Sequence, residues 1–545
     1  MHRASRGLHL ALLLSIVPIV APLSLFAQRP DRPPGAPPSS QASEPERSAE
    51  RGGSRATSEV PKYVVPKPEE KIVTTHHQIT LGGATIAYSA TTGTLLLRQE
   101  DGRPKASVFF VYYSRDGVKD ASKRPITYTF NGGPGSSSVW LHMGAFGPRR
   151  VVIDGNGPET YPPTPPAPPY RLVDNGESLL DVTDLVFIDP VSTGYSREAP
   201  GEDASQFHGF REDLESVGEF IRLWTVRFGR WESPKFLAGE SYGTTRAAGL
   251  SHYLQERHGM YLNGVVLLST ILNFATARFD TGNDLPYMLF LPTYTATAWY
   301  HKKLPDDLQK AGLKAAVAEA ERFATGEYNQ ALMLGSKLTT EQRRDVAAKL
   351  SRYTGLSAQY LESTNLRPTI AAFDKELLRD RRLTAGRLDS RYVGVDRTAT
   401  GESDEFDPSS TGTTGPFTAM FNHYVADELG FKSDMAYEIL TDRVRPWSYR
   451  EVSNRYLNVA EDLRRAMAEN PSLKIFVAKG YYDLATPFFA AEYTFDHLGY
   501  EPFYLQRITQ EHYEAGHMMY IRTADRQKLH ADVAAFIRAA EGVKP

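Results

Sequence analysis

Hydrophobic and polar positions first become regular near Thr74. Short segments that alternate or run apolar follow one another there, with Gly-Gly, Thr-Gly and Asp-Gly pairs between them. This pattern predicts an antiparallel β meander, because residues two apart share one face of a strand and glycine pairs favour turns. Its strands are expected at 77–81, 85–89, 93–98 and 107–113.

Apolar runs and amphipathic helices then alternate along the chain. Such alternation is typical of a mostly parallel sheet flanked by helices, so the predicted fold class is α/β. Buried strands are expected at 125–130, 185–189, 236–238, 264–269, 474–479 and 503–508. Helices are expected at 212–228 and 246–256, and a closing helix is expected to end near residue 540.

The alternation breaks between residues 274 and 430. Residues 283–301 are aromatic-rich, which fits either core packing or a substrate pocket. Residues 305–385 are rich in Lys, Arg, Glu and Ala and are expected to be helical, whereas the Gly/Ser/Thr/Asp-rich residues 395–416 are expected to form a loop. We therefore predict a helical insertion over the sheet edge that can act as a lid.

Residues 1–27 carry the signature of a secretory signal peptide. Arg3 and Arg6 precede a mostly apolar run at 8–26, and Ala27 is suited to stand just before a cleavage point. An uncleaved membrane anchor is the alternative, because the run is about long enough to span a bilayer. Two prolines within it and the lack of a charge cluster after it favour cleavage. The protein is thus expected to be exported, periplasmic or secreted, with no stable membrane span after cleavage.

The remaining chain divides into a linker and a core. Residues 28–70 are rich in Pro, Arg, Ser, Gly and Glu and lack periodic apolar residues, so they are expected to be a disordered linker. The α/β core is expected to comprise residues 71–273 and 431–545, with the insertion at 274–430 between the two parts.

Composition narrows the range of functions. The 545 residues carry a formal net charge of −3 and no cysteine. The charge and the lack of a basic stripe with interleaved aromatics argue against nucleic-acid binding. The absence of cysteine excludes a thiol nucleophile, disulfides and cysteine-bound metal. Since no HExxH or comparable ligand pattern occurs, no metal or cofactor is expected.

A Gly-x-Ser-x-Gly pattern at 239–243 stands between a predicted strand and a predicted helix, as in a nucleophile elbow. In such a turn the serine, here Ser241, projects its hydroxyl above the sheet. The residues two before and two after it come too close to neighbouring backbone to carry a Cβ, which explains the glycines. The five-residue pattern alone also fits an ordinary strand-to-helix turn with a surface serine.

A candidate acid and a candidate base follow later strands. Asp483 comes after a late buried strand, and His517 lies in the loop before the closing helix. The order Ser241, Asp483, His517 is that of the α/β-hydrolase triad. His517 would take the proton of the serine hydroxyl, and Asp483 would fix the imidazole tautomer. His512 is the rival base and Asp189 the rival acid.

A glycine-rich turn at 131–138 follows the strand expected at 125–130. Backbone N–H groups in such a turn come within reach of a ligand atom, and in a serine hydrolase one oxyanion donor comes from this position. A phosphate-binding loop is the rival interpretation. It fits poorly, because no Gly-Lys-Ser/Thr follows and Pro134 removes a donor.

Five motifs in order, NGGPGSSS, DLVFIDPVSTGYS, GESYGT, GYYDLATP and EAGHMMY, resemble the serine carboxypeptidase family (peptidase family S10), and its bacterial, cysteine-free branch in particular. The resemblance covers about residues 75–275 and 430–540. It implies an α/β-hydrolase fold and an enzyme that mostly removes one amino acid from the C-terminus of a peptide. The partner it implies is a peptide substrate with a free C-terminus.

The resemblance also implies a role for single residues. Carried over by position, it makes Ser241, Asp483 and His517 the catalytic triad. The backbone N–H groups of Gly133 and Tyr242 become the oxyanion hole.

Asn131 and Glu240 become, by the same resemblance, the pair that binds the terminal carboxylate of the substrate. A protonated Glu240 can donate a hydrogen bond to a carboxylate, whereas an ionised one would repel it. We therefore expect peptide binding to favour mildly acidic pH.

The chain departs from the family pattern at three positions. Ala145 stands where the better-known fungal and plant members have a second Glu, and Glu511 or Glu514 is either a substitute for it or a solvated loop residue. Ser136 replaces the cysteine usual after NGGPG. Ser192 replaces a usual glycine, which we expect to be tolerated.

These patterns together predict an exported serine-type carboxypeptidase that works through a Ser-His-Asp triad and an acyl-enzyme. An esterase or acyltransferase with the same triad is the first alternative, because the second Glu is missing. A binding protein with a relict site is the second, and it is disfavoured because all three triad residues are present.

Overall fold

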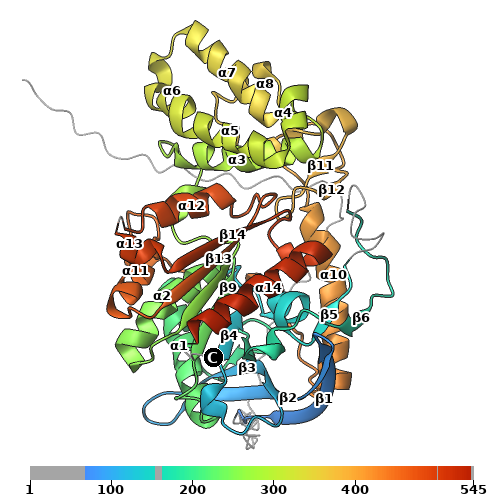
Figure 1. Cartoon of the computed structure of the whole chain (residues 1–545), viewed down its shortest axis with the longest axis vertical. Helices are drawn as coiled ribbons and strands as arrows, with labels where there is room; N and C mark the ends of the chain where they lie inside the picture. Colours follow the sequence, from blue (N-terminus) through green and yellow to red (C-terminus); the bar gives the residue numbers. More distant parts are fainter. Residues whose placement is uncertain (1–67, 154–162, 500, 542–545) are drawn as a thin grey trace, which may run out of the picture. The chain divides into compact units, whose positions relative to one another are not determined.

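A ten-stranded mixed sheet runs through the centre of the structure (Figure 1). The computed structural model describes residues 68–153, 163–499 and 501–541, so the predicted signal peptide and the predicted linker up to residue 67 lie outside the described residues. The strand order is β1-β2-β3-β7-β4-β9-β10-β13-β14, and β8 pairs with β3. The strands are β1 (Ile72–Leu81), β2 (Ala84–Arg98), β3 (Pro104–Arg115), β4 (Ile126–Phe130), β7 (Asp184–Ile188), β8 (Arg197–Glu198), β9 (Lys235–Glu240), β10 (Gly264–Leu268), β13 (Lys474–Gly480) and β14 (Ile508–Tyr513).

The six strands from β7 to β14 in this order run parallel, whereas β1, β2 and β3 form an antiparallel meander that joins β7. This arrangement confirms the predicted α/β class and the antiparallel start. The central parallel strands are almost continuously apolar because both faces are covered. On β7, Leu185 and Phe187 enter one hydrophobic cluster while Val186 and Ile188 enter the other.

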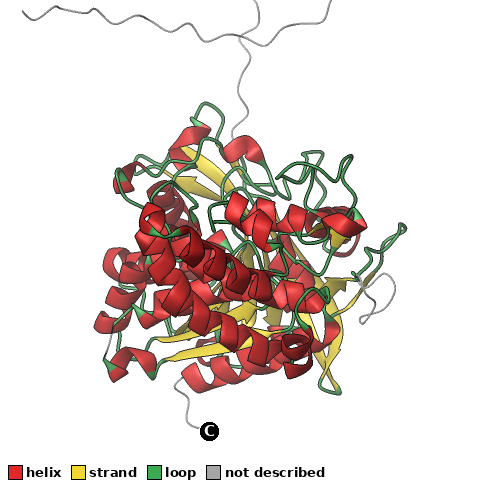
Figure 2. Cartoon of the chain, turned by 90° about the horizontal axis from the view of Figure 1, so that it is seen from above, coloured by secondary structure: helices red, strands yellow, loops and turns green. Residues whose placement is uncertain are grey.

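Helices cover both faces of the sheet (Figure 2). On one face, α1 (Phe210–Arg227), α2 (Tyr242–His258) and α11 (Ala460–Glu469) contribute their apolar side chains to the core. On the other face, α10 (Pro408–His423) and α14 (Thr523–Ala540) do the same. Within the described ranges, no helix combines the length and the apolar character needed to cross a bilayer.

The chain between β10 and β13 builds a helical cluster, coloured yellow-green in Figure 1, with a core of its own. Its helices are α3 (Leu285–Tyr300), α4 (Asp306–Ala311), α5 (Leu313–Phe323), α6 (Asn329–Leu334), α7 (Thr340–Thr354), α8 (Ala358–Ser363) and α9 (Ile370–Glu376). Helix α3 packs against α12 (Phe488–Asp496). A small apolar cluster also joins Ala296 and Val317 of the insertion to Tyr481 and Phe488. The aromatic run at 283–301 is thus mostly helix α3, and it serves core packing.

The prediction of a strand at 503–508 is wrong. Residues Pro502–Leu505 form the short helix α13, and the last strand, β14, begins at Ile508. Phe503 and Leu505 are 44% and 48% exposed, so the apolar run lies on the surface. Strand β14 is polar because it is the edge of the sheet, and its pairing with β13 decides its place.

Two further expectations differ from the structure. The loop expected at 395–416 contains most of α10, which begins at Pro408 with Asp407 as its cap. Its Gly, Ser and Thr residues suggested a loop, but Phe417 and Phe421 are buried in the core and hold the helix. The two strands expected at 85–89 and 93–98 are one strand, β2, because its pairing with β3 continues through the Thr-Gly pair.

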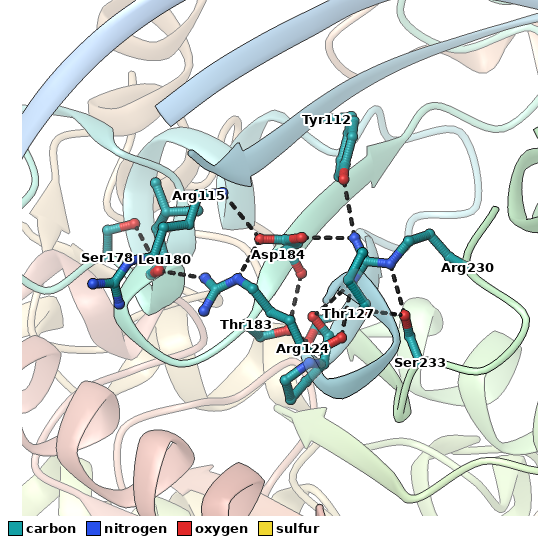
Figure 3. Close-up of polar contacts among 12 residues, drawn as sticks. Tyr112, Arg115, Arg124, Thr127, Ser178, Leu180, Thr183, Asp184, Arg230 and Ser233 are labelled. Atoms are coloured by element: carbon teal, nitrogen blue, oxygen red, sulfur yellow. Dashed lines mark hydrogen bonds and ion pairs between the residues drawn. The ribbon is translucent and has the colours of Figure 1, made fainter. Parts of the chain in front are cut away.

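Asp184 anchors the amino ends of β7 and β4 (Figure 3). Its two carboxylate oxygens lie 2.6 Å from Arg124 Nε and 2.6 Å from Arg230 Nη1. The N–H of Arg115 donates to the same carboxylate at 3.1 Å. Removing one partner of a buried carboxylate is strongly destabilising, because it leaves a charge unpaired. The three charged side chains therefore stabilise the arrangement of the strands at their amino ends.

Candidate active site

Four parallel strands end at one edge of the sheet, and the predicted site residues follow their carboxyl ends. Strands β4, β9, β13 and β14 lead directly into the glycine-rich turn, the elbow, and the loops of the candidate acid and base. A cavity of about 730 Å³ opens there. It is lined by, among others, Asn131, Gly133, Glu240, Ser241, Tyr242 and His517.

The elbow at 239–243 has the close backbone contacts that the glycine pattern predicted. Ser241 has φ 61° and ψ −131°, a strained conformation for a residue with a side chain. A Cβ on Gly239 would lie 2.1 Å from the carbonyl oxygen of Gly243, and a Cβ on Gly243 would lie 2.8 Å from that of Phe130. The strained backbone of Ser241 and the close contacts at the two glycines therefore act together to hold the serine at the end of the strand.

Asp483 and His517 form a buried pair. The Nδ1 of His517 lies 2.8 Å from Asp483 Oδ2, while Asp483 Oδ1 accepts the N–H groups of Ala485 at 2.9 Å and Thr486 at 3.0 Å. No hydrogen bond joins Ser241 Oγ to the imidazole within the described part of the chain. Such a bond is often long without substrate and tightens when substrate binds.

The pKa of His517 reflects these neighbours. Burial lowers it, but the charge and hydrogen bond of Asp483, together with the charge of Glu240, hold it above its ordinary value. The imidazole is therefore prepared to accept a proton, as a general base must do.

The rival base is engaged elsewhere. His512 Nε2 lies 2.8 Å from Glu492 Oε1, and its ring does not line the cavity. His517 follows Gly516, where a Cβ would lie 2.5 Å from Asp389 Cβ. The glycine thus permits a close approach of the backbone to Asp389 just before the candidate base.

The rival acid, Asp189, does not contact an imidazole. Its Oδ1 accepts two hydrogen bonds from Ser138, one from the backbone N–H at 2.8 Å and one from the side-chain hydroxyl at 2.7 Å. Burial raises the pKa of Asp189 to about 6. Asp189 therefore supports the turn after β4 and not the base. Ser192, which stands where the family usually has glycine, has φ 72°, and its hydroxyl is 2.8 Å from His208 Nε2.

Two residues that line the cavity have backbone N–H groups without a hydrogen-bond acceptor among the described residues. Among the described residues, neither the N–H of Gly133 nor that of Tyr242 donates a hydrogen bond. Tyr242 is the first residue of α2, where the helix leaves its N–H groups unpaired. A pair of such donors at the nucleophile can stabilise a developing oxyanion.

Asn131 and Glu240 are in contact. Asn131 Nδ2 donates to Glu240 Oε1 at 3.0 Å, and the Asn131 side chain is itself held by the N–H of Leu141. Glu240 is only 3% exposed, and its Oε2 has no hydrogen-bond partner among the described residues. Burial raises the pKa of Glu240 to about 7, against the opposing charge of His517. Near neutral pH a large fraction of this carboxyl is protonated.

Tyr520 is a site residue that the sequence did not single out. Its hydroxyl is close enough to Glu240 to affect the pKa of that carboxyl. Its ring packs on Gly144, where a Cβ would lie 2.4 Å from the Tyr520 Cε2. Next to it, Ala145 is buried and does not line the cavity. The phenol of Tyr520 thus lies beside Glu240. In the sequence, the only indication of this was the position of Tyr520, three residues after the candidate base.

Neither proposed substitute for the missing Glu lies in the cavity. Glu511 is 2.7 Å from Lys528 Nζ, and Glu514 is exposed. Glu514 is therefore a solvated loop residue, whereas Glu511 lies on strand β14 and is paired with Lys528. Ser136, which replaces the usual cysteine, accepts a hydrogen bond from Trp140 Nε1 at 2.9 Å.

The segment 387–391 of the insertion holds the catalytic loops, and sequence analysis missed it. The carbonyl of Leu388 accepts the N–H of His517 at 2.6 Å, and the carbonyl of Arg387 accepts the N–H of Leu484 at 3.1 Å. The candidate acid and base thus depend on a segment about one hundred residues away. No apolar periodicity marks it, so no sequence pattern could have found it.

A buried ion pair supports the glycine-rich turn. Arg246 Nε lies 2.8 Å from Asp213 Oδ2, and Arg246 Nη1 donates to the carbonyl of Asn131 at 2.6 Å. Both charged side chains are almost completely buried. Arg246 therefore positions Asn131, the first residue of the glycine-rich turn. The two buried charges compensate each other, so removing either one would leave the other unpaired.

Comparison with known proteins places this chain among serine carboxypeptidase sequences. A family model described as serine carboxypeptidase matches residues 91–524. Serine carboxypeptidase-like 36 of Arabidopsis thaliana is 24% identical over 51% of this chain and 55% of its own length. Serine carboxypeptidase-like 45 of the same plant is 27% identical over 46% and 48%. The chain spans about half the length of the curated relatives it matches.

A solved structure shares the architecture. Kex1Δp, a prohormone-processing carboxypeptidase from Saccharomyces cerevisiae, matches with a TM-score of 0.52 and 16% identity, over 83% of this chain and 91% of that chain. The likeness is one of fold, and it confirms the α/β-hydrolase architecture expected from the five motifs.

Proposed function

Because a family model covers residues 91–524, this chain belongs to the serine carboxypeptidase family, and we propose that it hydrolyses the C-terminal peptide bond of peptides as a serine-type carboxypeptidase. One observation carries the proposal. Glu240, a buried carboxyl with a pKa of about 7, lines the same cavity as Ser241 and His517. A carboxyl that is neutral near pH 7 is suited to bind another carboxylate next to a nucleophile.

The proposed reaction begins at Ser241. His517 takes the hydroxyl proton as the oxygen attacks the last peptide carbonyl, and Asp483 stabilises the imidazolium. The N–H groups of Gly133 and Tyr242 stabilise the oxyanion. The C–N bond then breaks, and the departing amine receives the proton from His517. Water, activated by the same base, hydrolyses the acyl-enzyme and restores the serine hydroxyl.

Glu240 decides where the peptide is cut. Its Oε1 accepts from Asn131, so a proton on the carboxyl is best placed on Oε2, which has no partner among the described residues. That O–H donates to the terminal carboxylate of the substrate. A terminal carboxylate accepts this bond more strongly than an uncharged peptide carbonyl does, so binding beside Ser241 favours the release of a single residue.

The affinity for a free-acid ligand is expected to fall as pH rises through 7. Burial raises the pKa of Glu240 to about 7, so the neutral form that binds a carboxylate predominates below this pH and is lost above it. Well above pH 7 the inhibition constant of an N-blocked amino acid should rise by up to about tenfold per pH unit. On the acid side, protonation of His517 lowers kcat, which makes the profile of kcat/KM bell-shaped.

Glu240→Gln is the matched control for this prediction. Its amide oxygen can still accept from Asn131, and its amide nitrogen can donate at every pH. The inhibition constant should therefore become independent of pH from about 6 to 9. An unchanged pH dependence in Glu240→Gln would show that another group titrates.

The activity itself is tested by following the release of the C-terminal amino acid from an N-blocked dipeptide. The same dipeptide with an amidated C-terminus and the Ser241→Ala protein are run beside it. Release from the free acid only, and only with Ser241, supports the proposal. Cleavage of an ester through Ser241 without release from either peptide would favour the esterase or acyltransferase alternative.

We also propose that the protein is exported, periplasmic or secreted. The support is the apolar run at 8–26 behind Arg3 and Arg6. Expression of the full chain in a bacterial host, followed by fractionation and mass spectrometry, should give a mature chain that begins at Gln28. A full-length chain that stays with the membrane fraction would contradict cleavage.

A further inference from the structure

Three arginines line the cavity, and two of them have no carboxylate partner among the described residues. The guanidinium of Arg278 lies 5.4 Å from the ring centroid of Phe274, which lines the same wall. Arg387 belongs to the segment that holds the catalytic loops. Both side chains are exposed. The third arginine, Arg445, has Asp442 as a partner at 3.6 Å.

Arg387 is close enough to the reacting groups to act on them electrostatically. Its charge opposes the rise in the pKa of His517. It also acts on Asp374, a buried carboxyl whose pKa burial raises well above its usual range. Asp374 forms no ion pair with the Arg387 guanidinium among the described residues, and its Oδ1 has no hydrogen-bond partner there.

None of the acidic side chains that line the cavity forms an ion pair with the guanidinium of Arg278 or Arg387 among the described residues. Asp407 caps α10 and accepts the N–H groups of Arg387 and Leu388, both at 3.1 Å. Asp442 is the partner of the third arginine. Glu240 is partly neutral near pH 7 because burial raises its pKa to about 7. Three arginines against Asp407 and Asp442 leave about one net positive charge in the cavity, and neither the Arg278 nor the Arg387 guanidinium is held in an ion pair among the described residues, so a substrate carboxylate can pair with them.

From this charge balance we propose that Arg278 and Arg387 make the enzyme prefer peptides with an acidic side chain on a residue flanking the scissile bond. The inference rests on the proposed carboxypeptidase function. It concerns the side chains of the substrate, since the terminal carboxylate is assigned to Asn131 and Glu240. Complementary charge favours the correct substrate, and like charge excludes a basic one.

The size of the preference follows from the exposure of the two arginines. One exposed ion pair changes affinity by up to a factor of about five, so two arginines together give at most about 25-fold, and we expect a preference of about tenfold. Because the charges are exposed, the preference weakens as ionic strength rises.

The test compares N-blocked dipeptides that differ at one position only, with Glu, Gln or Lys either before or after the scissile bond. The quantity measured is the ratio of kcat/KM for the Glu peptide to that for the Gln peptide, at about pH 6, where the Glu side chain is ionised. Taking the ratio within each protein cancels any change in the base. Wild type, Arg278→Gln, Arg387→Gln and the double variant are compared, with Arg445→Gln as the matched control.

In the wild type we expect a ratio of about ten in one of the two series, and the series that carries it locates the acidic side chain. Each single variant should lower the ratio, the double variant should bring it to about one, and Arg445→Gln should keep it. Equal rates for the Glu and Gln peptides in both series, or a ratio that survives in the double variant, would overturn the inference and leave the proposed function intact. No release from any peptide would overturn the proposed function, and the inference with it.

Discussion

Replacing Ser241 with alanine should lower kcat for release of the C-terminal amino acid by about 10⁶-fold, as expected when a triad loses its nucleophile. The hydroxyl is the only group at the elbow that can form the acyl-enzyme. The fold should survive, because the change removes one oxygen atom at the cavity wall and leaves both flanking glycines. The measurements are single-turnover kinetics and labelling by a fluorophosphonate, which reacts only with an activated serine.

Ser241→Gly is the matched control, because it removes the same hydroxyl and also relieves the backbone. Ser241 has φ 61°, a value that costs about 1 kcal/mol or more for a residue with a Cβ and little for glycine. Ser241→Gly should therefore be as inactive as Ser241→Ala but more stable to denaturant by about 1 kcal/mol. Residual labelling of either variant would point to a different nucleophile.

Asp483→Asn is expected to lower kcat by about 10⁴-fold with little change in KM. Two backbone N–H groups, from Ala485 and Thr486, point at Oδ1, so the amide oxygen of asparagine will occupy that position. Its NH₂ then faces the Nδ1 of His517, which must become an acceptor. The proton moves to Nε2, and the imidazole can no longer take the proton of Ser241.

Asp189→Asn separates this tautomer effect from the loss of a buried carboxylate. Asp189 is also buried and follows a parallel strand of the same sheet, β7, but its contacts are with Ser138. Its variant should lose stability and keep kcat per folded molecule, which is measured by active-site titration. A loss of kcat in Asp189→Asn that matches Asp483→Asn would contradict the assignment of the acid.

The parts of the fold that were predicted correctly are those where local pattern and burial coincide. Strands β7 and β10 run apolar because both of their faces are covered, and such runs are visible in the sequence. Strand β14 was misplaced because an edge strand is half polar, while the exposed Phe503 and Leu505 imitate a buried run. Helix α10 was missed because propensity favoured a loop and tertiary packing overrode it.

Local sequence patterns were sufficient to predict the candidate residues of the site. The glycines at 239 and 243 are needed because neighbouring backbone leaves no room for a side chain there. The order of Ser241, Asp483 and His517 follows from the order of the strands that precede them. Such signals are local, because each depends on a few neighbouring residues and on one turn.

The surroundings of these residues become visible only in the folded chain. Tyr520 beside Glu240, Arg246 under the carbonyl of Asn131, and the segment 387–391 against His517 join residues far apart in the chain. Burial by distant elements, and not any local pattern, is also what raises the pKa of Glu240 to about 7. Hydrophobic periodicity records which face of an element is buried but not what lies against it, so the charges and contacts that tune the site appear only when the chain is folded.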